Sequence, residues 1–330
     1  MRIGTWQNSE EIRIVSTRVR TQSFKRQFLV FIVPSSSIAS PLLSVLNAER
    51  NFDIAVRFYD DPGANDQFLT DADFVMTGGL SKFHAASQFL RSNEFLSQYD
   101  GYLFLDGDLE FNASQLSAFL AFVNAANLDL AQPSVTRDSY CYWKMAYQQQ
   151  GFVFREASFV EVMAPYMSRF ALSKLLPTFE KSISTYGLDL VWPSLVGNKA
   201  IAVVDAFQVR HRDRVDHASG SFYRYLKSID VDLEEDERLM LAEYGVKREQ
   251  AHSRRGYFWR RQWPLFGGPS ALVSVPLGGP EGRTNEQFLI DLAMRAARMR
   301  RGRLEAQLEM AISPYLSGDR ISAVISDGNV

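Results

Sequence analysis

Short apolar runs alternate with longer helical patterns through about the first two thirds of the chain, and this alternation constrains the fold most. The short runs predicted as strands are Phe28–Val33, Asp53–Tyr59, Tyr102–Leu105, Leu128–Gln132 and Ile201–Val204. The helical patterns are Pro41–Arg50, Lys82–Ser97, Ala113–Asn127 and Arg169–Ser182. Because such alternation is typical of a sheet covered by helices, the sequence predicts an α/β fold with a mainly parallel sheet flanked by helices.

The composition allows a large core and argues against one class of partner. The chain has 330 residues, of which 46% are hydrophobic and 22% are charged, so disorder of the whole chain is excluded. Lys and Arg number 36 against 38 Asp and Glu, which gives a formal net charge of -2. A chain with this balance is not one that coats nucleic acid, so no nucleic-acid partner is expected.

The single cysteine and the amino terminus both bear on the compartment. Cys141 has no second cysteine with which to form an intramolecular disulfide. We interpret it as a small, half-buried apolar residue, because no His lies near it in the sequence. Met1–Gln27 is polar, and no apolar stretch long enough for a signal peptide or a membrane span follows it. These observations predict a cytoplasmic protein.

Changes in composition divide the chain into three segments. We predict a polar arm over residues 1–27, an α/β domain over 28–225 and a mostly helical extension over 226–330. In the extension, Asn285–Ile312 has apolar residues at helical spacings with arginines clustered among them. This predicted helix either packs against its own chain or docks on the inner face of a membrane, a partner or a second copy.

The strongest local signal is an apolar strand that ends in two carboxylates separated by one glycine, Tyr102-Leu-Phe-Leu-Asp-Gly-Asp. In open α/β sheets the ligand crevice lies outside the carboxyl ends of the strands, so Asp106 and Asp108 would face it. Mg²⁺ and Mn²⁺ prefer oxygen ligands and commonly take one or two carboxylates plus substrate phosphates. Gly107 would let the backbone turn tightly between the two ligands. The alternatives are a solvated Asp-Gly turn and a calcium loop, although the other EF-hand ligands are missing.

Two more acidic residues each have a functional and a structural interpretation. Glu161 lies alone in an apolar run, where it could bind an acceptor hydroxyl or act as a base, or could pair with Arg155 or Arg169. Asp189 lies at the predicted start of a short helix. It could favour the helix N-terminus electrostatically, or take a proton from an acceptor hydroxyl.

Two basic residues also lie at predicted strand or helix ends. His211 follows the predicted strand Ile201–Val204 and Asp205, and could be a metal or phosphate ligand or an ordinary loop residue. Lys82 follows Gly78-Gly79, and could contact a phosphate or lie solvated at a helix start. The sequence alone leaves both choices open.

Taken together and in this order, five segments resemble the family known as domain of unknown function seven hundred and seven, which is grouped with GT-A glycosyltransferases. The matching segments are Gly78–His84, Tyr99–Leu109, Phe159–Pro165, Tyr186–Pro193 and Ile201–His211. The resemblance covers about residues 28–225 and implies a GT-A-like (Rossmann-like) fold. Plant-like members have a longer acidic stretch where this chain has Leu105-Asp-Gly-Asp, but the two carboxylates remain.

The resemblance further implies a nucleotide-sugar donor that is held through its diphosphate by Mn²⁺ or Mg²⁺. By that analogy the donor-site residues are Ser35, Asp60, Lys82 and Asp106, and the metal ligands are Asp106, Asp108 and His211. Asp189 is then the expected base of an inverting displacement, with Glu161 as its rival.

The resulting expectation is a metal-dependent glycosyltransferase that moves a sugar to a hydroxyl of a glycan or other acceptor, with polysaccharide biosynthesis as the family context. One alternative is a nucleotidyltransferase or nucleotide-sugar hydrolase of the same fold. Another is a non-catalytic module that binds nucleotide-sugars. Both stay open at this point, because a fold does not fix a reaction.

Overall fold

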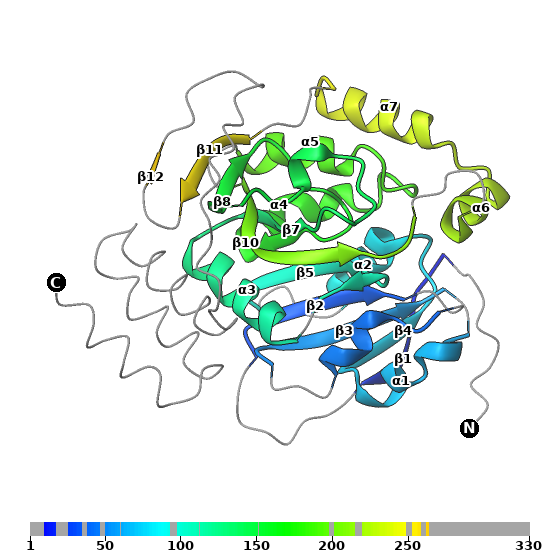
Figure 1. The fold of residues 1–330 in the computed structure, drawn as a ribbon. Coiled ribbons are helices and arrows are strands. Elements are labelled where there is room, and N and C mark those ends of the chain that lie inside the picture. The colour runs from blue at the N-terminus through cyan, green and yellow to red at the C-terminus, as the bar shows by residue number, and fades with distance from the viewer. Residues whose placement is uncertain are drawn as a thin grey trace, which may run out of the picture.

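The computed structural model describes most of the first 263 residues (Figure 1). The described ranges are 10–17, 26–34, 38–46, 50–59, 61–92, 98–111, 113–150, 152–197, 201–214, 220–248, 253–258 and 262–263. The predicted site residues Ser35 and Asp60, and the predicted helix Asn285–Ile312, lie outside them. None of the helices in these ranges is long and apolar enough to cross a membrane.

A single twelve-stranded sheet organises the described chain, in the order β1-β4-β3-β2-β5-β9-β7-β10-β8-β11-β12, with β6 paired to β10. The strands are β1 (Arg13–Thr17), β2 (Phe28–Val33), β3 (Phe52–Phe58), β4 (Phe74–Thr77), β5 (Gly101–Asp106), β6 (Leu109–Glu110), β7 (Leu130–Val135), β8 (Phe152–Ala157), β9 (Tyr166–Ser168), β10 (Ile201–His211), β11 (Ser253–Phe258) and β12 (Gln262–Trp263). The central strands β4, β3, β2 and β5 run parallel, as do β7 and β10. Antiparallel β9 joins the two groups. The predicted α/β class with a mainly parallel sheet is therefore confirmed.

Helices cover both faces of this sheet (Figure 1). The α-helices are α1 (Gln67–Asp71), α2 (Lys82–Ser92), α3 (Ala113–Ala125), α4 (Arg169–Leu175), α5 (Leu188–Val196), α6 (Ser221–Ser228) and α7 (Leu233–Tyr244). Strand β2 shows the consequence for the core: Val30 and Ile32 pack with α3, whereas Leu29 and Phe31 pack with α2, α4 and α5. Successive side chains of a strand point to opposite faces, so a strand that is covered on both sides must be apolar throughout.

The segment after residue 225, predicted as a separate extension, contacts the sheet domain in two places. Helix α7 runs along α5 in Figure 1, and its Met240 joins the apolar cluster of Leu188 and Trp192. A Cβ atom at Gly187, which has φ 81°, would meet Met240 at 2.9 Å, so glycine is required there. Strand β11 adds to the edge of the sheet beside β8. Within the predicted polar arm, β1 pairs with β4.

Two of the predicted helices are shorter than the sequence pattern indicates. The pattern Arg169–Ser182 becomes α4, which ends at Leu175, followed by a 3₁₀ turn at Leu176–Thr178. Pro177 explains the break, because proline lacks an amide donor and clashes with the preceding turn of an α-helix. The pattern Pro41–Arg50 becomes a 3₁₀ helix over Pro41–Val45.

The largest correction concerns β10, which was predicted to end at Val204 but continues to His211. Val204 pairs with Pro133 and Gln208 pairs with Ser134, so the register along β7 shifts by three residues. A bulge at this point fits the neighbouring strand, because Pro133 has no amide hydrogen for a regular ladder. Asp205, which follows the predicted strand, therefore lies inside β10 and is 1% exposed.

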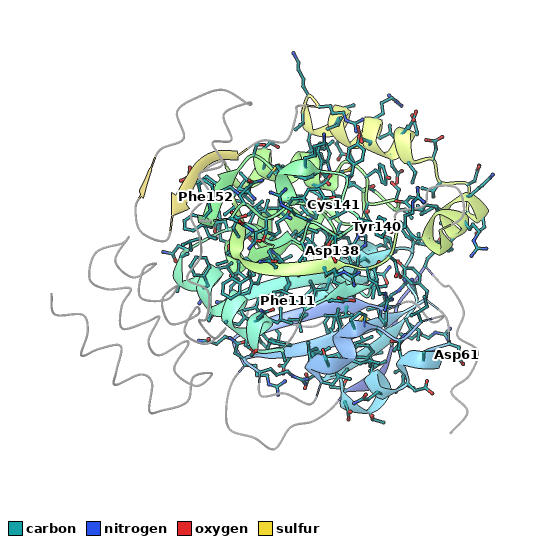
Figure 2. All side chains as sticks on the ribbon, viewed as in Figure 1. Asp61, Phe111, Asp138, Tyr140, Cys141 and Phe152 are labelled. Carbon is teal, nitrogen blue, oxygen red and sulfur yellow. The ribbon has the colours of Figure 1, made fainter. Side chains whose placement is uncertain are left out.

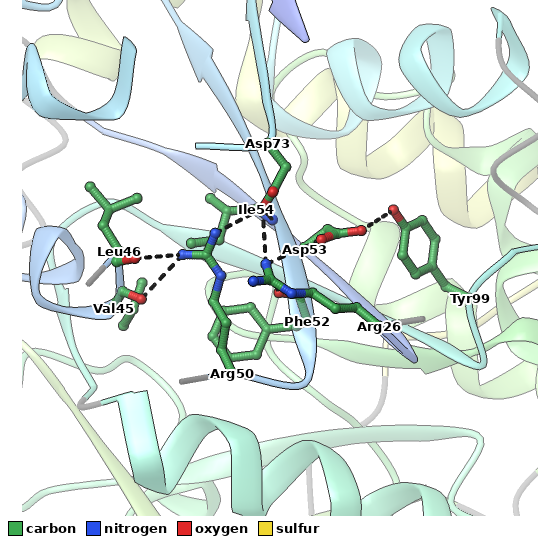
Figure 3. A network of polar contacts seen from close by, with 9 residues as sticks. All are labelled: Arg26, Val45, Leu46, Arg50, Phe52, Asp53, Ile54, Asp73 and Tyr99. Carbon is green, nitrogen blue, oxygen red and sulfur yellow. Dashed lines mark hydrogen bonds and ion pairs between the residues drawn. The ribbon is translucent and has the colours of Figure 1, made fainter. Parts of the chain in front are cut away.

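A buried ionic network ties together the amino-terminal parts of the sheet (Figure 3). The Oδ2 atom of Asp73 accepts hydrogen bonds from Arg50 Nη2 at 2.9 Å, Arg26 Nη1 at 3.3 Å and the Ile54 amide at 2.9 Å. Arg50 also donates to the carbonyl of Leu46 at 3.0 Å, at the end of the 3₁₀ helix. These bonds lie at the edge of the sheet opposite the carboxyl ends of β2 and β5. They therefore stabilise the fold and involve no residue at the carboxyl ends of those strands.

Candidate active site

Asp106 is the last residue of β5 and Asp108 follows it closely, so both lie at the carboxyl ends of the parallel strands, as predicted. Asp106 pairs in register with Val33 of β2, and the Gly107 amide donates to the Val33 carbonyl at 3.1 Å. A Cβ atom at position 107 would collide with the Pro34 backbone. Glycine is therefore needed because two backbones approach closely there, which is a different reason from the tight turn expected from the sequence.

Lys82 contacts the first of these carboxylates. It opens α2 directly after a loop in which Gly78 and Gly79 have φ values of 82° and 76°. Its Nζ lies 2.6 Å from Asp106 Oδ1 and 2.5 Å from the Val162 carbonyl oxygen. The Lys82 side chain is only 7% exposed, whereas that of Asp106 is 39% exposed. A solvated lysine at a helix start, one of the two open interpretations, is thereby excluded.

The environment of Asp106 works against its charge. Burial raises the pKa of the Asp106 carboxyl, the ammonium of Lys82 lowers it, and the charge of Asp108 raises it again. The net direction is upward, because the cost of burying the charge and the repulsion from Asp108 together outweigh the attraction of Lys82 and His211. A further cation at this point would therefore be stabilised by the site.

His211 contacts the second carboxylate. The Nε2 of His211 lies 3.0 Å from Asp108 Oδ2, and its Nδ1 lies 2.5 Å from the Tyr140 carbonyl oxygen. The pairing of His211 with Leu109 across β10 and β6 sets this position. Burial lowers the pKa of His211, but the hydrogen bond and charge of Asp108 outweigh it and raise that pKa to about 9. Both ring nitrogens face acceptors, so the ring is an imidazolium at neutral pH.

Glu161 lies beside this pair of contacts. Its backbone amide donates to Gln132 Oε1 at 2.6 Å, and its Oε2 accepts a hydrogen bond from Cys141 Sγ at 3.1 Å. Burial raises the pKa of Glu161 to about 7, although Cys141 and His211 lower it. The half-buried position predicted for Cys141 is confirmed.

The structural alternative for Glu161, an ion pair with Arg155 or Arg169, is wrong. Arg155 instead binds Asp205 through two hydrogen bonds, and Arg169 binds Asp100 at 2.8 Å. Glu161 is therefore left without a cationic partner among the described residues, which is consistent with its raised pKa.

Asp189 lies in the first turn of α5, as expected, and is 8% exposed. Its Oδ1 accepts from the Leu190 amide at 3.0 Å. Burial raises the pKa of Asp189 well above its usual value, and the nearby negative charge of Glu161 raises it further. Glu161 and Asp189 therefore lie within electrostatic reach of each other, and burial disfavours the ionised form of both.

Sequence reasoning missed an arginine and a group of aromatic side chains at this edge. Arg57 of β3 is fully buried, donates to the carbonyls of Gly78 and Gly79, and places its guanidinium 3.2 Å from the centre of the Tyr59 ring. Tyr225 of α6 packs on the same ring, with centroids 6.0 Å apart. A lone arginine inside the apolar run Phe52–Tyr59 was the signal that could have shown this arrangement.

The donor set fits a hard divalent cation in part. Among the described residues, the second oxygen of each carboxylate, Asp106 Oδ2 and Asp108 Oδ1, has no protein hydrogen bond or ion pair. These oxygens suit Mg²⁺ or Mn²⁺ when a substrate phosphate supplies further ligands. The part of the chain that the structure describes contains no group of three His, Cys, Asp or Glu side chains arranged as a metal site. To become a ligand, His211 would have to release its Nε2 proton, so its predicted coordination stays a prediction.

A separate crevice of about 770 Å³ lies at the opposite edge of the sheet and contains none of these carboxylates. Asp100, Asn127, Arg169 and Phe170 contribute to its lining. It lies at the amino ends of the parallel strands, where open α/β folds do not place their principal ligand sites. The carboxylate edge therefore remains the candidate active site.

Comparison with known proteins gives likenesses of fold. No protein-family model matches the sequence and no curated protein matches it, so the resemblance to the family of unknown function stays a prediction. Residues 1–349 of TarS from S. aureus, solved in complex with UDP-GlcNAc, match at 12% identity over 66% of this chain and 71% of that chain, with a TM-score of 0.40. GalNAc-T7, solved with UDP, GalNAc and Mn²⁺, matches at 10% identity over 66% of this chain, with a TM-score of 0.42.

A third solved structure belongs to a different class of enzyme. The 4-diphosphocytidyl-2C-methyl-D-erythritol synthase of Anaerococcus prevotii matches at 10% identity over 62% of this chain and 97% of its own, with a TM-score of 0.36. This chain spans about half of GalNAc-T7, at 51% of its length. Identities and TM-scores this low establish no function, so the function must be argued from the site itself.

Proposed function

We propose that this protein is a glycosyltransferase that uses Mn²⁺ or Mg²⁺ to move a sugar from a nucleotide-sugar to a hydroxyl of an acceptor. One observation carries the proposal: two carboxylates that each have one oxygen without a protein partner follow a buried parallel strand, and two further carboxylates with raised pKa values lie nearby, Glu161 within electrostatic reach of Asp106 and Asp189 within reach of Glu161. The first pair suits a metal-bound diphosphate, and the second pair suits proton transfer.

The metal-facing pair has supporting charges. A divalent cation held by Asp106 and Asp108 would neutralise the negative charge that develops on the departing nucleoside diphosphate. Lys82 keeps Asp106 in place through a contact of 2.6 Å, and His211 does the same for Asp108 at 3.0 Å. Because both cationic partners are nearly buried, the orientation of each carboxylate is set before substrate binds.

The proton-accepting group is Glu161 or Asp189. A general base works best when its pKa lies near the operating pH, and the pKa of about 7 for Glu161 meets that condition. Asp189 is the base that the resemblance implies, and its raised pKa also makes it a stronger proton acceptor than a solvated aspartate. The ionised member of the pair would take the hydroxyl proton as the acceptor oxygen attacks the anomeric carbon.

Product analysis with Asp189→Asn and Glu161→Gln tests this proposal. The protein is incubated with a panel of nucleotide-sugars, Mn²⁺ and candidate acceptors, and both nucleotide release and the glycosylated product are quantified. We expect the variant that lacks the base to lose transfer by about 100-fold or more while it still binds nucleotide. Full transfer by both variants would exclude a role for this pair, and nucleotide release without product would indicate a hydrolase.

A further inference from the structure

The segment between β7 and β8 presents aromatic rings to solvent next to the carboxylates. Figure 2 labels Asp138, Tyr140 and Cys141 of this segment, which lie between α5 and β10 in that view. The Tyr142 side chain is 73% exposed and that of Tyr140 is 47% exposed. Among the described residues, the other strongly exposed aromatic side chain is Phe170, which lies at the opposite edge of the sheet.

The backbone of this aromatic segment, Tyr140 to Trp143, is held by several bonds. The Tyr147 hydroxyl donates to the carbonyls of Ser139 and Cys141 at 3.2 Å and 3.3 Å. The Ser139 hydroxyl accepts from the His211 amide at 2.9 Å. The exposed rings therefore stand on a tethered backbone, which lowers the entropy lost when a ligand packs against them.

Packing holds the other end of the segment. The Tyr142 ring meets the Trp143 ring edge-on, with centroids 5.1 Å apart. Trp143 in turn packs on Phe159, with centroids 4.7 Å apart, and Phe159 is only 3% exposed. The exposed Tyr142 ring therefore packs against a ring that itself contacts the core.

Two atoms of the segment touch the candidate active site directly. The Tyr140 carbonyl oxygen lies 2.5 Å from His211 Nδ1, and Cys141 Sγ donates to Glu161 Oε2 at 3.1 Å. The residue between Cys141 and Trp143 is Tyr142, so its ring starts one residue away from a contact with the proposed proton-accepting pair. A molecule that packs on Tyr142 would therefore be held beside the segment that contacts the candidate active site.

Charged groups of both signs surround the segment. Glu161 offers an acceptor for hydroxyl hydrogens, and the His211 ring is already paired with Asp108. Arg210, the residue before His211 on β10, is bound to both Glu110 at 2.9 Å and Asp138 at 2.7 Å. Arg137 and Lys144, on either side of the aromatic segment, are exposed and have no ion pair among the described residues. These surroundings suit a ligand rich in hydroxyl groups, with or without acidic substituents.

We propose that Tyr142, supported by Trp143 and flanked by Tyr140, is the platform for a sugar ring of a glycan acceptor. A pyranose has an apolar face of C–H groups that packs on an aromatic ring and an edge of hydroxyls that bind carboxylates. The inference rests on the proposed function, because it names the acceptor class for the same site. It makes Tyr142 a residue that sets acceptor specificity, and leaves the metal and donor residues unchanged in their roles.

Direct binding measurements test this assignment without requiring knowledge of the natural acceptor. Labelled hexasaccharides of glucose, galactose, mannose and N-acetylglucosamine are titrated into the full chain, with and without Mn²⁺ and UDP. We expect at least one to bind the wild type, Tyr142→Ala to weaken that binding about tenfold or more, and Tyr142→Phe and Tyr142→Trp to keep it within about threefold. Phe170→Ala is the matched control, an exposed aromatic ring removed at the other edge, and should bind as the wild type does.

The same samples are tested for nucleotide binding, so the two hypotheses fail separately. Wild type that binds a nucleotide but no hexasaccharide overturns the acceptor assignment and leaves the proposed function standing. Equal binding by Tyr142→Ala and wild type overturns it as well. Wild type that binds no nucleotide contradicts the proposed function itself. Thermal unfolding of each variant shows whether a loss of binding comes from a loss of fold.

Discussion

Two of the ionic contacts on strand β10, at Asp205 and six residues later at His211, differ in exposure and in the hydrogen-bonding capacity left for a ligand. Asp205 and Arg155 are both 0% exposed in their side chains, and two hydrogen bonds of 2.7 Å and 2.9 Å join them. The Gln149 amide donates a third bond to Asp205 Oδ1 at 2.8 Å. At the other end of the strand, the Asp108 side chain that pairs with His211 is 22% exposed and keeps one oxygen open.

The difference separates a structural ion pair from a candidate functional one. A buried charge is tolerated when its hydrogen-bonding capacity is used by the protein, and then nothing is left for a ligand. Asp205 meets that condition, although its position after an apolar run looked like that of Asp106 in the sequence. Asp106 and Asp108 do not meet it, because each has one oxygen bound by a protein cation and one oxygen without a protein partner among the described residues.

Replacing Asp205 by Ala should have the largest effect on stability. The substitution leaves the Arg155 guanidinium buried without its carboxylate, and arginine cannot lose its proton to relieve the cost. Breaking such a pair typically costs about 3–5 kcal/mol, which urea unfolding would measure. Asp66→Ala, at an exposed residue without a side-chain cap bond, is the control. Equal stability of the two variants would contradict the structural role of Asp205.

Replacing Asp108 by Ala should give the reverse result, a large loss of activity with a small loss of stability. We expect sugar transfer to fall by about 100-fold or more, because the metal loses a ligand. The free energy of unfolding should change by about 1 kcal/mol or less, because His211 can release its proton when its partner is gone. Transfer assays and urea unfolding of the same sample decide the matter. A loss of stability as large as that of Asp205→Ala would remove the contrast between the two sites.

The pH dependence of stability should reveal the strained carboxylate Glu161. Its pKa is raised from 4.5 to about 7 in the folded protein, so the folded state holds this proton more tightly than the unfolded state does. The favourable contribution is complete below pH 4.5 and is lost as the pH rises through 7. Glu161→Gln removes this loss, so the variant should gain stability over the wild type between pH 5 and pH 8, by at most about 3 kcal/mol. Urea unfolding of the wild type and the variant at pH 5 and pH 8 measures this gain. If Glu161 were solvated, the difference in unfolding free energy between the two proteins would be the same at both pH values.

The smallest effect concerns the thiol behind the candidate site. Burial raises the pKa of Cys141, and the nearby Glu161 carboxylate raises it further. Because the thiolate is the reactive form, alkylation by iodoacetamide at pH 8 should be slower than that of a free cysteine peptide by about tenfold or more. Glu161→Gln should speed the reaction a few-fold. Mass spectrometry of the timed reaction gives both rates. If Cys141 of the wild type reacted as fast as the free cysteine peptide, its thiol would be exposed to solvent.

The sequence predicted well whatever depends on a local pattern. The run Phe28–Val33 has the boundaries of β2, because a strand buried on both faces is apolar at every position. Asp106 and Asp108 were placed at the end of β5 for a similar reason, since charge marks the point where such a strand leaves the core. The fold class and the position of these two carboxylates follow from local signals of this kind.

Long-range partners could not be read from the sequence. Nothing near Asp205 in the chain indicates that Arg155 covers it, and nothing near Glu161 indicates that Cys141 contacts it. The bulge that carries β10 on to His211 depends on Pro133 of a neighbouring strand, which lies about 70 residues earlier. Tertiary packing decides contacts of this type. Asp106 and Asp205 therefore had the same signal in the sequence, an Asp directly after an apolar run, but have different surroundings in the structure.

The most direct test of the central claim is a thermal-shift and calorimetric screen of UDP, GDP, CMP and their sugars, with and without Mn²⁺. It compares the wild type with the Asp106→Ala, Asp108→Ala double variant. The account predicts that one nucleotide class stabilises the wild type only when Mn²⁺ is present, and does not stabilise the variant. Equal stabilisation of both proteins, or no response of the wild type to any nucleotide with Mn²⁺, would contradict the assignment of these two carboxylates to a metal-bound donor.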